Sequence, residues 1–184
     1  MENCYSDIQY HDPLVTPIGS GKFKVNPIAK NLYPIFVKFS KLAFLIRKND
    51  STVKQDIRYF KRLGWDIKQF QGKTGYDNKE DDEPGFVAYH KRNNILIVTF
   101  RGSDSSVKNP KTKKALDWEV NLDFRMVKTQ HGLFHRGFYN KAKASRASLM
   151  QILIKFLRKP GPKPKIFFTG HSQGAALAPI AAFF

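Results

Sequence analysis

Cysteine, long apolar runs and targeting signals are scarce or missing in this sequence, and each shortage excludes a class of protein. Cys4 is the only cysteine among 184 residues, so the chain has no disulfide framework and no cysteine-based zinc site. The most apolar early segment, residues 32–46, contains Pro34 and two lysines and cannot span a bilayer. The N-terminus lacks the basic and apolar regions of a Sec-type signal peptide. We therefore expect a protein that is cytoplasmic or exported by a non-Sec route.

Acidic residues are also few. The chain has 32 Lys and Arg against 15 Asp and Glu, a formal net charge of +17, and no carboxylate side chain follows Asp123. A basic surface of this kind attracts anionic partners such as a membrane surface, although a solvated basic surface without a partner fits equally well. Nucleic acid is not expected, because the sequence has neither zinc-finger spacing nor an aromatic RNA-binding signature. Nothing in the sequence indicates a cofactor, a metal site or an oligomeric state.

The apolar pattern predicts one α/β domain. We expect residues 1–26 to form an irregular extension and residues 27–184 to form the domain. Apolar residues at helical spacing predict helices over residues 34–46, 52–63 and 138–157. Strands are expected at residues 65–71, 86–91 and 95–100, and the acidic stretch 72–84 is expected to be a solvated hairpin loop. A crossover helix between two apolar strands indicates a mostly parallel sheet.

One motif carries chemistry. Residues 165–174 read KIFFTGHSQG, an apolar run that meets a glycine-flanked serine, and small residues follow. This is the pattern of a nucleophile elbow, in which Gly170 and Gly174 leave room for a strained turn at Ser172. The alternative is a glycine-rich strand-to-helix turn with an inert serine.

Three further motifs occur upstream of this elbow. A buried strand ends in FRGS at residues 100–103, Asp-Trp and Asn-Leu-Asp-Phe follow at residues 117–124, and His-Arg-Gly-Phe opens a helix at residue 135. In this order, and at these approximate spacings, the chain resembles the class 3 (fungal-type) lipases over residues 35–184.

The resemblance implies an α/β-hydrolase fold and hydrolysis of lipid or other acyl esters. Ser172 matches the nucleophile that forms an acyl-enzyme. Ser103 and the backbone N–H of Gln173 match the oxyanion hole. His135 matches a structural histidine, and residues 104–118 match the position of a lid. As a hypothesis, the lysines of this lid make it a mobile flap that favours anionic interfaces.

The same resemblance leaves the catalytic Asp and His without matching residues. In α/β-hydrolases both follow the serine, but all five histidines lie at or before residue 171 and no acid follows Asp123. We therefore expect an incomplete α/β-hydrolase domain that is inactive or weak by itself. The alternative is a non-catalytic lipase-like fragment whose basic surface binds an anionic partner, and a third arrangement would use His131 or His135 as the base.

Overall fold

The computed structural model describes residues 15–17, 23–25, 27–46, 51–74, 80–106, 108–109 and 113–184. The chain divides into two units, Met1–Val37 and Lys38–Phe184. In the first unit, β1 (Val15–Pro17) pairs antiparallel with β2 (Phe23–Val25). The sequence did not predict this pair, and most of the predicted irregular extension lies outside the described residues. The predicted domain boundary at residue 26 stays a prediction.

The predicted first helix begins earlier than expected. α1 covers Pro27–Leu45 and holds Pro34 in its interior. α2 covers Ser51–Arg62 and is followed by Gly64, whose φ of +91° suits a glycine at a helix end. None of the described helices is both long and apolar enough to cross a membrane.

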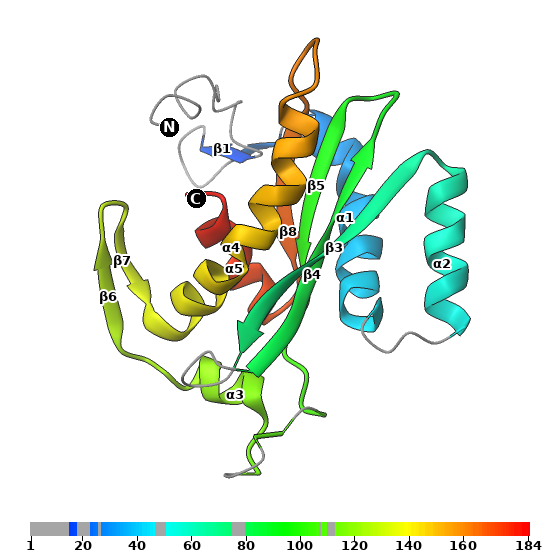
Figure 1. Ribbon diagram of the computed structural model, residues 1–184. Helices are drawn as coiled ribbons and strands as arrows, with labels where there is room; N and C mark the ends of the chain where they lie inside the picture. The colour runs from blue at the N-terminus through cyan, green and yellow to red at the C-terminus, as the bar shows by residue number, and fades with distance from the viewer. Residues whose placement is uncertain are drawn as a thin grey trace. The chain divides into compact units, whose positions relative to one another are not determined.

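A four-stranded sheet forms the centre of the second unit (Figure 1). Its order is β3 (Trp65–Thr74), β4 (Glu80–His90), β5 (Ile95–Phe100) and β8 (Lys165–Gly170). Only β5 and β8 pair in parallel. The prediction of a mostly parallel sheet was therefore wrong for the described strands, and the sheet is mixed. β3, β4 and β5 follow one another through short connections, which force antiparallel pairing, whereas β5 and β8 are joined by a crossover helix.

The prediction of a long acidic loop over residues 72–84 was also wrong at both ends of that range. β3 continues to Thr74 and β4 begins at Glu80, with a register shift between Phe70 and Gly72. Asp77, at the centre of the predicted loop, lies outside the described residues. The acidic residues 80–83 therefore belong to a strand, where alternate side chains face inward.

Helices cover the sheet. The crossover helix α4 (Arg136–Leu157) and the final helix α5 (Gln173–Ala181) share one apolar cluster with the sheet. In this cluster, Leu96, Val98 and Phe100 of β5 meet side chains that include Leu149 and Leu177. Every residue of β5 is buried, as predicted for a central strand with both faces covered.

Two elements link the sheet to α4, the short helix α3 (Leu116–Asn121) and a hairpin. The hairpin consists of β6 (Met126–Thr129) and β7 (Gly132–His135). The sequence did not predict this hairpin, because its strands are only four residues long and alternate weakly. His135 ends the hairpin and caps α4, since its Nδ1 accepts a hydrogen bond from the backbone N–H of Phe138 (3.3 Å).

An aromatic cluster on Phe39 gives the fold a direct test. The Phe39 ring lies 4.8 Å from Phe60, 5.1 Å from Trp65 and 5.4 Å from Phe86, centroid to centroid. Phe39→Ala should lower the free energy of unfolding by ~3–5 kcal/mol, because it leaves a cavity under the sheet. Urea denaturation followed by tryptophan fluorescence measures this. Tyr59→Ala, at a largely exposed position on α2, should cost less than about 1 kcal/mol. Equal losses in both variants would contradict the packing.

Candidate active site

The turn between β8 and α5 holds Ser172 in a strained conformation. Its φ is 54° and its ψ is −121°, which non-glycine residues rarely adopt. A Cβ on Gly170 would lie 2.4 Å from the backbone of Gly174, and one on Gly174 would lie 2.3 Å from the Phe100 carbonyl oxygen. Both glycines are therefore required by close backbone approach. Ser172 is exposed, and its hydroxyl makes no capping bond to α5.

The parallel pairing of β5 and β8 brings a second segment to this turn. Phe100 pairs with Gly170, so the residues that follow both strands emerge at the same edge of the sheet. A Cβ on Gly102 would lie 3.1 Å from the carbonyl oxygen of His171 and 3.4 Å from the Cβ of Ser172. Ser103, the residue matched to the oxyanion hole, directly follows this contact.

A pair of amide hydrogen bonds joins the two segments. Gln173 Nε2 donates to Asn121 Oδ1 (2.8 Å), and Asn121 Nδ2 donates to the hydroxyl oxygen of Ser103 (3.0 Å). Gln173 Nε2 also donates to the backbone carbonyl of Asp117 (3.1 Å). Asn121 was part of a sequence motif, but no role was predicted for its side chain.

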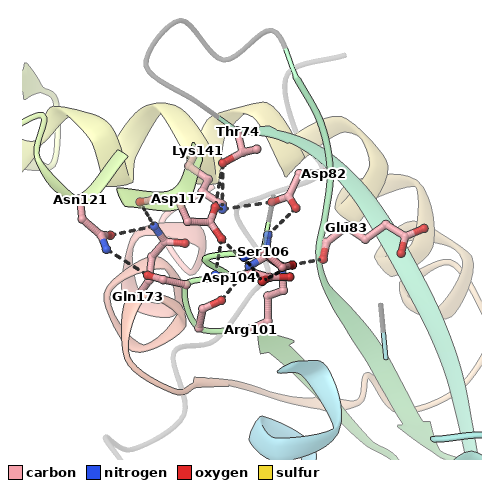
Figure 2. A network of polar contacts seen from close by, with 12 residues as sticks. Thr74, Asp82, Glu83, Arg101, Asp104, Ser106, Asp117, Asn121, Lys141 and Gln173 are labelled. Carbon is pink, nitrogen blue, oxygen red and sulfur yellow. Dashed lines mark hydrogen bonds and ion pairs between the residues drawn. The ribbon is translucent and has the colours of Figure 1, made fainter. Parts of the chain in front are cut away.

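Four buried charges lie beside this connection (Figure 2). Arg101 donates from Nη2 to Asp82 Oδ1 (2.5 Å) and from Nη1 to Asp117 Oδ2 (2.6 Å). Lys141 pairs with Asp82 Oδ2 (3.1 Å) and with Asp117 Oδ1. All four side chains are at most 2% exposed. Two cations therefore balance two carboxylates inside the protein.

The buried charges strongly shift the pKa values of Asp117 and Arg101. Burial alone would raise the pKa of Asp117, but Lys141 and Arg101 outweigh it and hold that pKa well below its usual range. Burial alone would lower the pKa of Arg101, and the two carboxylates raise it instead. Arg101 and Asp117 are therefore both charged at neutral pH.

The same network holds the loop that contains Ser103. Arg101 Nη1 donates to the carbonyl oxygen of Gly102 (2.7 Å). On the other side of Ser103, Asp117 Oδ2 accepts a hydrogen bond from the backbone N–H of Asp104 (2.7 Å). The backbone on both sides of Ser103 is thus fixed by buried ions.

This network corrects the interpretation of Asp82 as a solvated loop residue. Asp82 lies on β4 and faces inward toward Arg101. The network also restricts the predicted mobile flap, residues 104–118, because Asp117 in α3 is held by its buried ion pair with Arg101. Trp118, the next residue, is exposed. The mobility of the rest of that segment stays a prediction, and Lys111 lies outside the described residues. The only sequence signal for the network was an arginine directly after a fully apolar strand.

None of the described histidines is hydrogen-bonded to the hydroxyl of Ser172. His90 is bound through both ring nitrogens, to the Leu63 carbonyl oxygen (3.0 Å) and to the Asn93 N–H (3.2 Å). His131 stacks on Phe183 with ring centroids 5.1 Å apart, and His135 caps α4. No hydrogen bond joins any of them, or His171, to the serine hydroxyl among the described residues. These residues also contain no cluster of three or more His, Cys, Asp or Glu side chains that could hold a metal ion.

Comparison with known proteins agrees with this geometry. The model of the family "Lipase (class 3)" matches residues 97–184, from β5 through α5. Residues 97–184 are thus similar to the class 3 lipases. A solved fungal lipase–inhibitor complex, described as a model for interfacial activation in lipases, matches the fold with a TM-score of 0.57 and 19% sequence identity. The match covers 85% of this chain and 54% of that lipase, so this chain spans about half the length of that relative.

The turn between β8 and α5 should not tolerate a larger residue at position 174. Gly174→Ala places a methyl group against the Phe100 carbonyl oxygen, and backbone cannot move aside as a side chain does. We expect a loss of ~1–3 kcal/mol in the free energy of unfolding, measured by urea denaturation. Ala175→Ser, at an exposed position one residue later, should change stability by less than about 0.5 kcal/mol. An unchanged Gly174→Ala protein would contradict the close approach.

The four buried charges give a test with a pH signature. Asp117→Asn leaves Arg101 and Lys141 with one carboxylate and should cost ~3–5 kcal/mol at neutral pH. Because folding lowers the pKa of Asp117, its contribution is complete above its unfolded pKa of about 3.9 and is lost as pH falls toward the folded pKa. The stability difference between wild type and variant should therefore narrow below about pH 3.9.

Asp66→Asn is the matched control. Asp66 is half exposed and pairs with Lys68 at the surface (3.5 Å), so its loss should cost less than about 1 kcal/mol. If Asp117→Asn behaves like Asp66→Asn, the buried network does not hold the fold.

Proposed function

We propose that this chain carries the nucleophile and the oxyanion hole of a carboxylic-ester hydrolase. Its substrates would be lipid esters, triacylglycerol or phospholipid, and the reaction would pass through an acyl-enzyme on Ser172. The observation that carries the proposal is the strained, exposed Ser172 at a strand–helix turn, between two glycines that have no room for a side chain. Asn94 and Lys113 also have positive φ values (49° and 59°), but neither is flanked by glycines as Ser172 is.

In the proposed reaction, a base takes the Ser172 hydroxyl proton as the serine oxygen attacks the ester carbonyl carbon. The same proton then passes to the leaving alcohol oxygen as the ester C–O bond breaks. That base would have to come from outside the residues that follow Ser172 in this sequence. The backbone N–H groups of Gln173 and Ser103 would bind the oxyanion, each contributing ~2.7–4 kcal/mol. The Ser103 hydroxyl oxygen already accepts a hydrogen bond from Asn121, so its own proton can point toward the oxyanion. Asn121 would thus orient a third donor.

We propose that these 184 residues alone are inactive or weak. Attack by serine needs a base, and neither His nor a carboxylate follows Ser172 in this sequence. His90, His131 and His135 each contact other residues, and none of them is hydrogen-bonded to Ser172. A second candidate function, a non-catalytic lipase-like fragment that binds an anionic partner, is favoured by the net charge of +17.

Labelling with a fluorophosphonate distinguishes the two functions. We expect slow modification of Ser172, located by mass spectrometry of its peptide, because the elbow exposes the hydroxyl and the oxyanion donors stabilise the adduct. Ser172→Ala should abolish the label. Ser103→Ala should slow it by a factor of several, since only the hydroxyl donor is lost.

Circular dichroism of each variant shows whether it is folded. A folded wild-type protein that stays unlabelled, or one labelled at another serine, would leave only the non-catalytic function.

A further inference from the structure

One face of the β6–β7 hairpin carries a row of apolar side chains around a lysine. In the register of the hairpin, Met126 lies opposite His135 and Lys128 lies opposite Leu133. Opposed residues of an antiparallel pair share a face, as do residues two apart along a strand. Phe124 extends the row, since its ring contacts His135 with centroids 5.8 Å apart. We call Phe124, Met126, Lys128 and Leu133 the outer hairpin face.

The apolar residues of this face are exposed. Phe124 is 69% exposed, Met126 57% and Leu133 65%. The opposite face of the hairpin packs against the protein, where Phe134 stacks on Tyr139 and contacts Phe183. One face of the hairpin therefore packs against the protein, and its second apolar face lies at the surface. Single exposed apolar residues are ordinary, but a row of three on one ribbon marks an interaction surface.

The charge around the outer hairpin face is positive. Lys128 lies within the row and Arg125 lies between two of its members. Asp123, the last carboxylate side chain of the sequence, is buried and paired with Arg125 (2.8 Å) and Arg136 (2.7 Å). No acidic side chain follows to offset the cations. The surface thus combines exposed apolar groups with an excess of positive charge, because one carboxylate faces two arginines and Lys128 lies within the row.

We propose that the outer hairpin face docks on an anionic lipid bilayer. Phe124, Met126 and Leu133 would enter the headgroup region, and Lys128 and Arg125 would contact lipid phosphates. A second copy of the chain fits less well, because a symmetric contact would bring the two cationic faces together. Nucleic acid would use the cations but would gain little from three aliphatic or aromatic groups on a ribbon. The docking does not depend on Ser172 being a nucleophile.

The test is co-sedimentation with vesicles, carried out on Ser172→Ala protein so that ester hydrolysis cannot alter the lipid. One set of vesicles is phosphatidylcholine and the other is phosphatidylcholine mixed with phosphatidylglycerol. We expect binding to the anionic set and little to the neutral set. The double variant Met126→Ser/Leu133→Ser should lower the partition coefficient by about tenfold or more, through lost apolar burial. Lys128→Gln should lower it by about fivefold and flatten its salt dependence.

Matched controls separate this surface from general charge and hydrophobicity. Leu63→Ser removes an exposed apolar side chain and Lys155→Gln an exposed lysine, both remote in sequence from the hairpin. Both controls should bind as the parent does. All these positions are exposed, so the variants should keep the parent circular dichroism spectrum.

Insertion itself has a spectroscopic signature. Leu133→Trp in a Trp118→Phe background should show a blue shift of emission when anionic vesicles are added. The Trp118→Phe parent, which keeps only the buried Trp65, should show none. The proposal is overturned if the hairpin and control variants bind alike, or if Leu133→Trp emission does not move. It is also overturned if the serine substitutions instead dissociate a dimer in sedimentation velocity, or if Lys128→Gln alone abolishes binding to a DNA duplex while vesicle binding is unchanged. Fluorophosphonate labelling of Ser172 is read separately, so either proposal can fail without the other.

Discussion

The buried pairing of two cations with two carboxylates is the constraint on which the site depends. Arg101, Lys141, Asp82 and Asp117 come from a strand end, the crossover helix, a second strand and a short helix, so their attraction ties four elements together. Removing one member leaves an unpaired charge in a low-dielectric interior, which costs far more than any surface ion pair. An apolar replacement of the whole set would fill the space, but it would lose the oriented bonds to Gly102 and Asp104. The network therefore fixes the geometry of the loop that contains Ser103 as well as the fold.

The turn at Ser172 and the loop at Ser103 follow the same end of the parallel strand pair β5 and β8. Their separation is set by backbone contacts, because Gly102 and Gly174 leave no side chain between β5 and the turn at Ser172. The amide bonds from Gln173 through Asn121 to Ser103 then couple the residue after the serine to the loop. Strain at Ser172 persists because the surroundings on both sides are rigid. A serine hydroxyl and its electrostatic surroundings are thus positioned before any substrate binds.

Local patterns were sufficient to predict part of this arrangement. The central strand, the crossover helix and the glycine-flanked serine are each specified within about ten residues, by apolar runs, helical spacing and turn chemistry. Asp82 could not be assigned in this way, because the five acidic residues between positions 77 and 83 look like a solvated loop. Asp82 is a buried ion only because it pairs with Arg101 and Lys141, which are distant in sequence. The mixed sheet was missed for a related reason. A crossover helix is visible in the sequence, whereas the number of antiparallel neighbours depends on where hairpins turn. The β6–β7 hairpin is held by Phe134 and Phe183, a contact between residues 49 positions apart that no local pattern contains.

The balance of the buried charges also bears on the excess of positive charge. Inside the protein, the two cations of the network meet two carboxylates, and Asp123 is matched by Arg125 and Arg136. The buried network therefore accounts for none of the net charge of +17. Such an excess opposes folding through self-repulsion and is not needed for the core. Its concentration after Asp123, on the same stretch that exposes Met126 and Leu133, fits a surface adapted to an anionic, partly apolar partner. A bilayer has both properties, since phosphate groups lie directly above hydrocarbon.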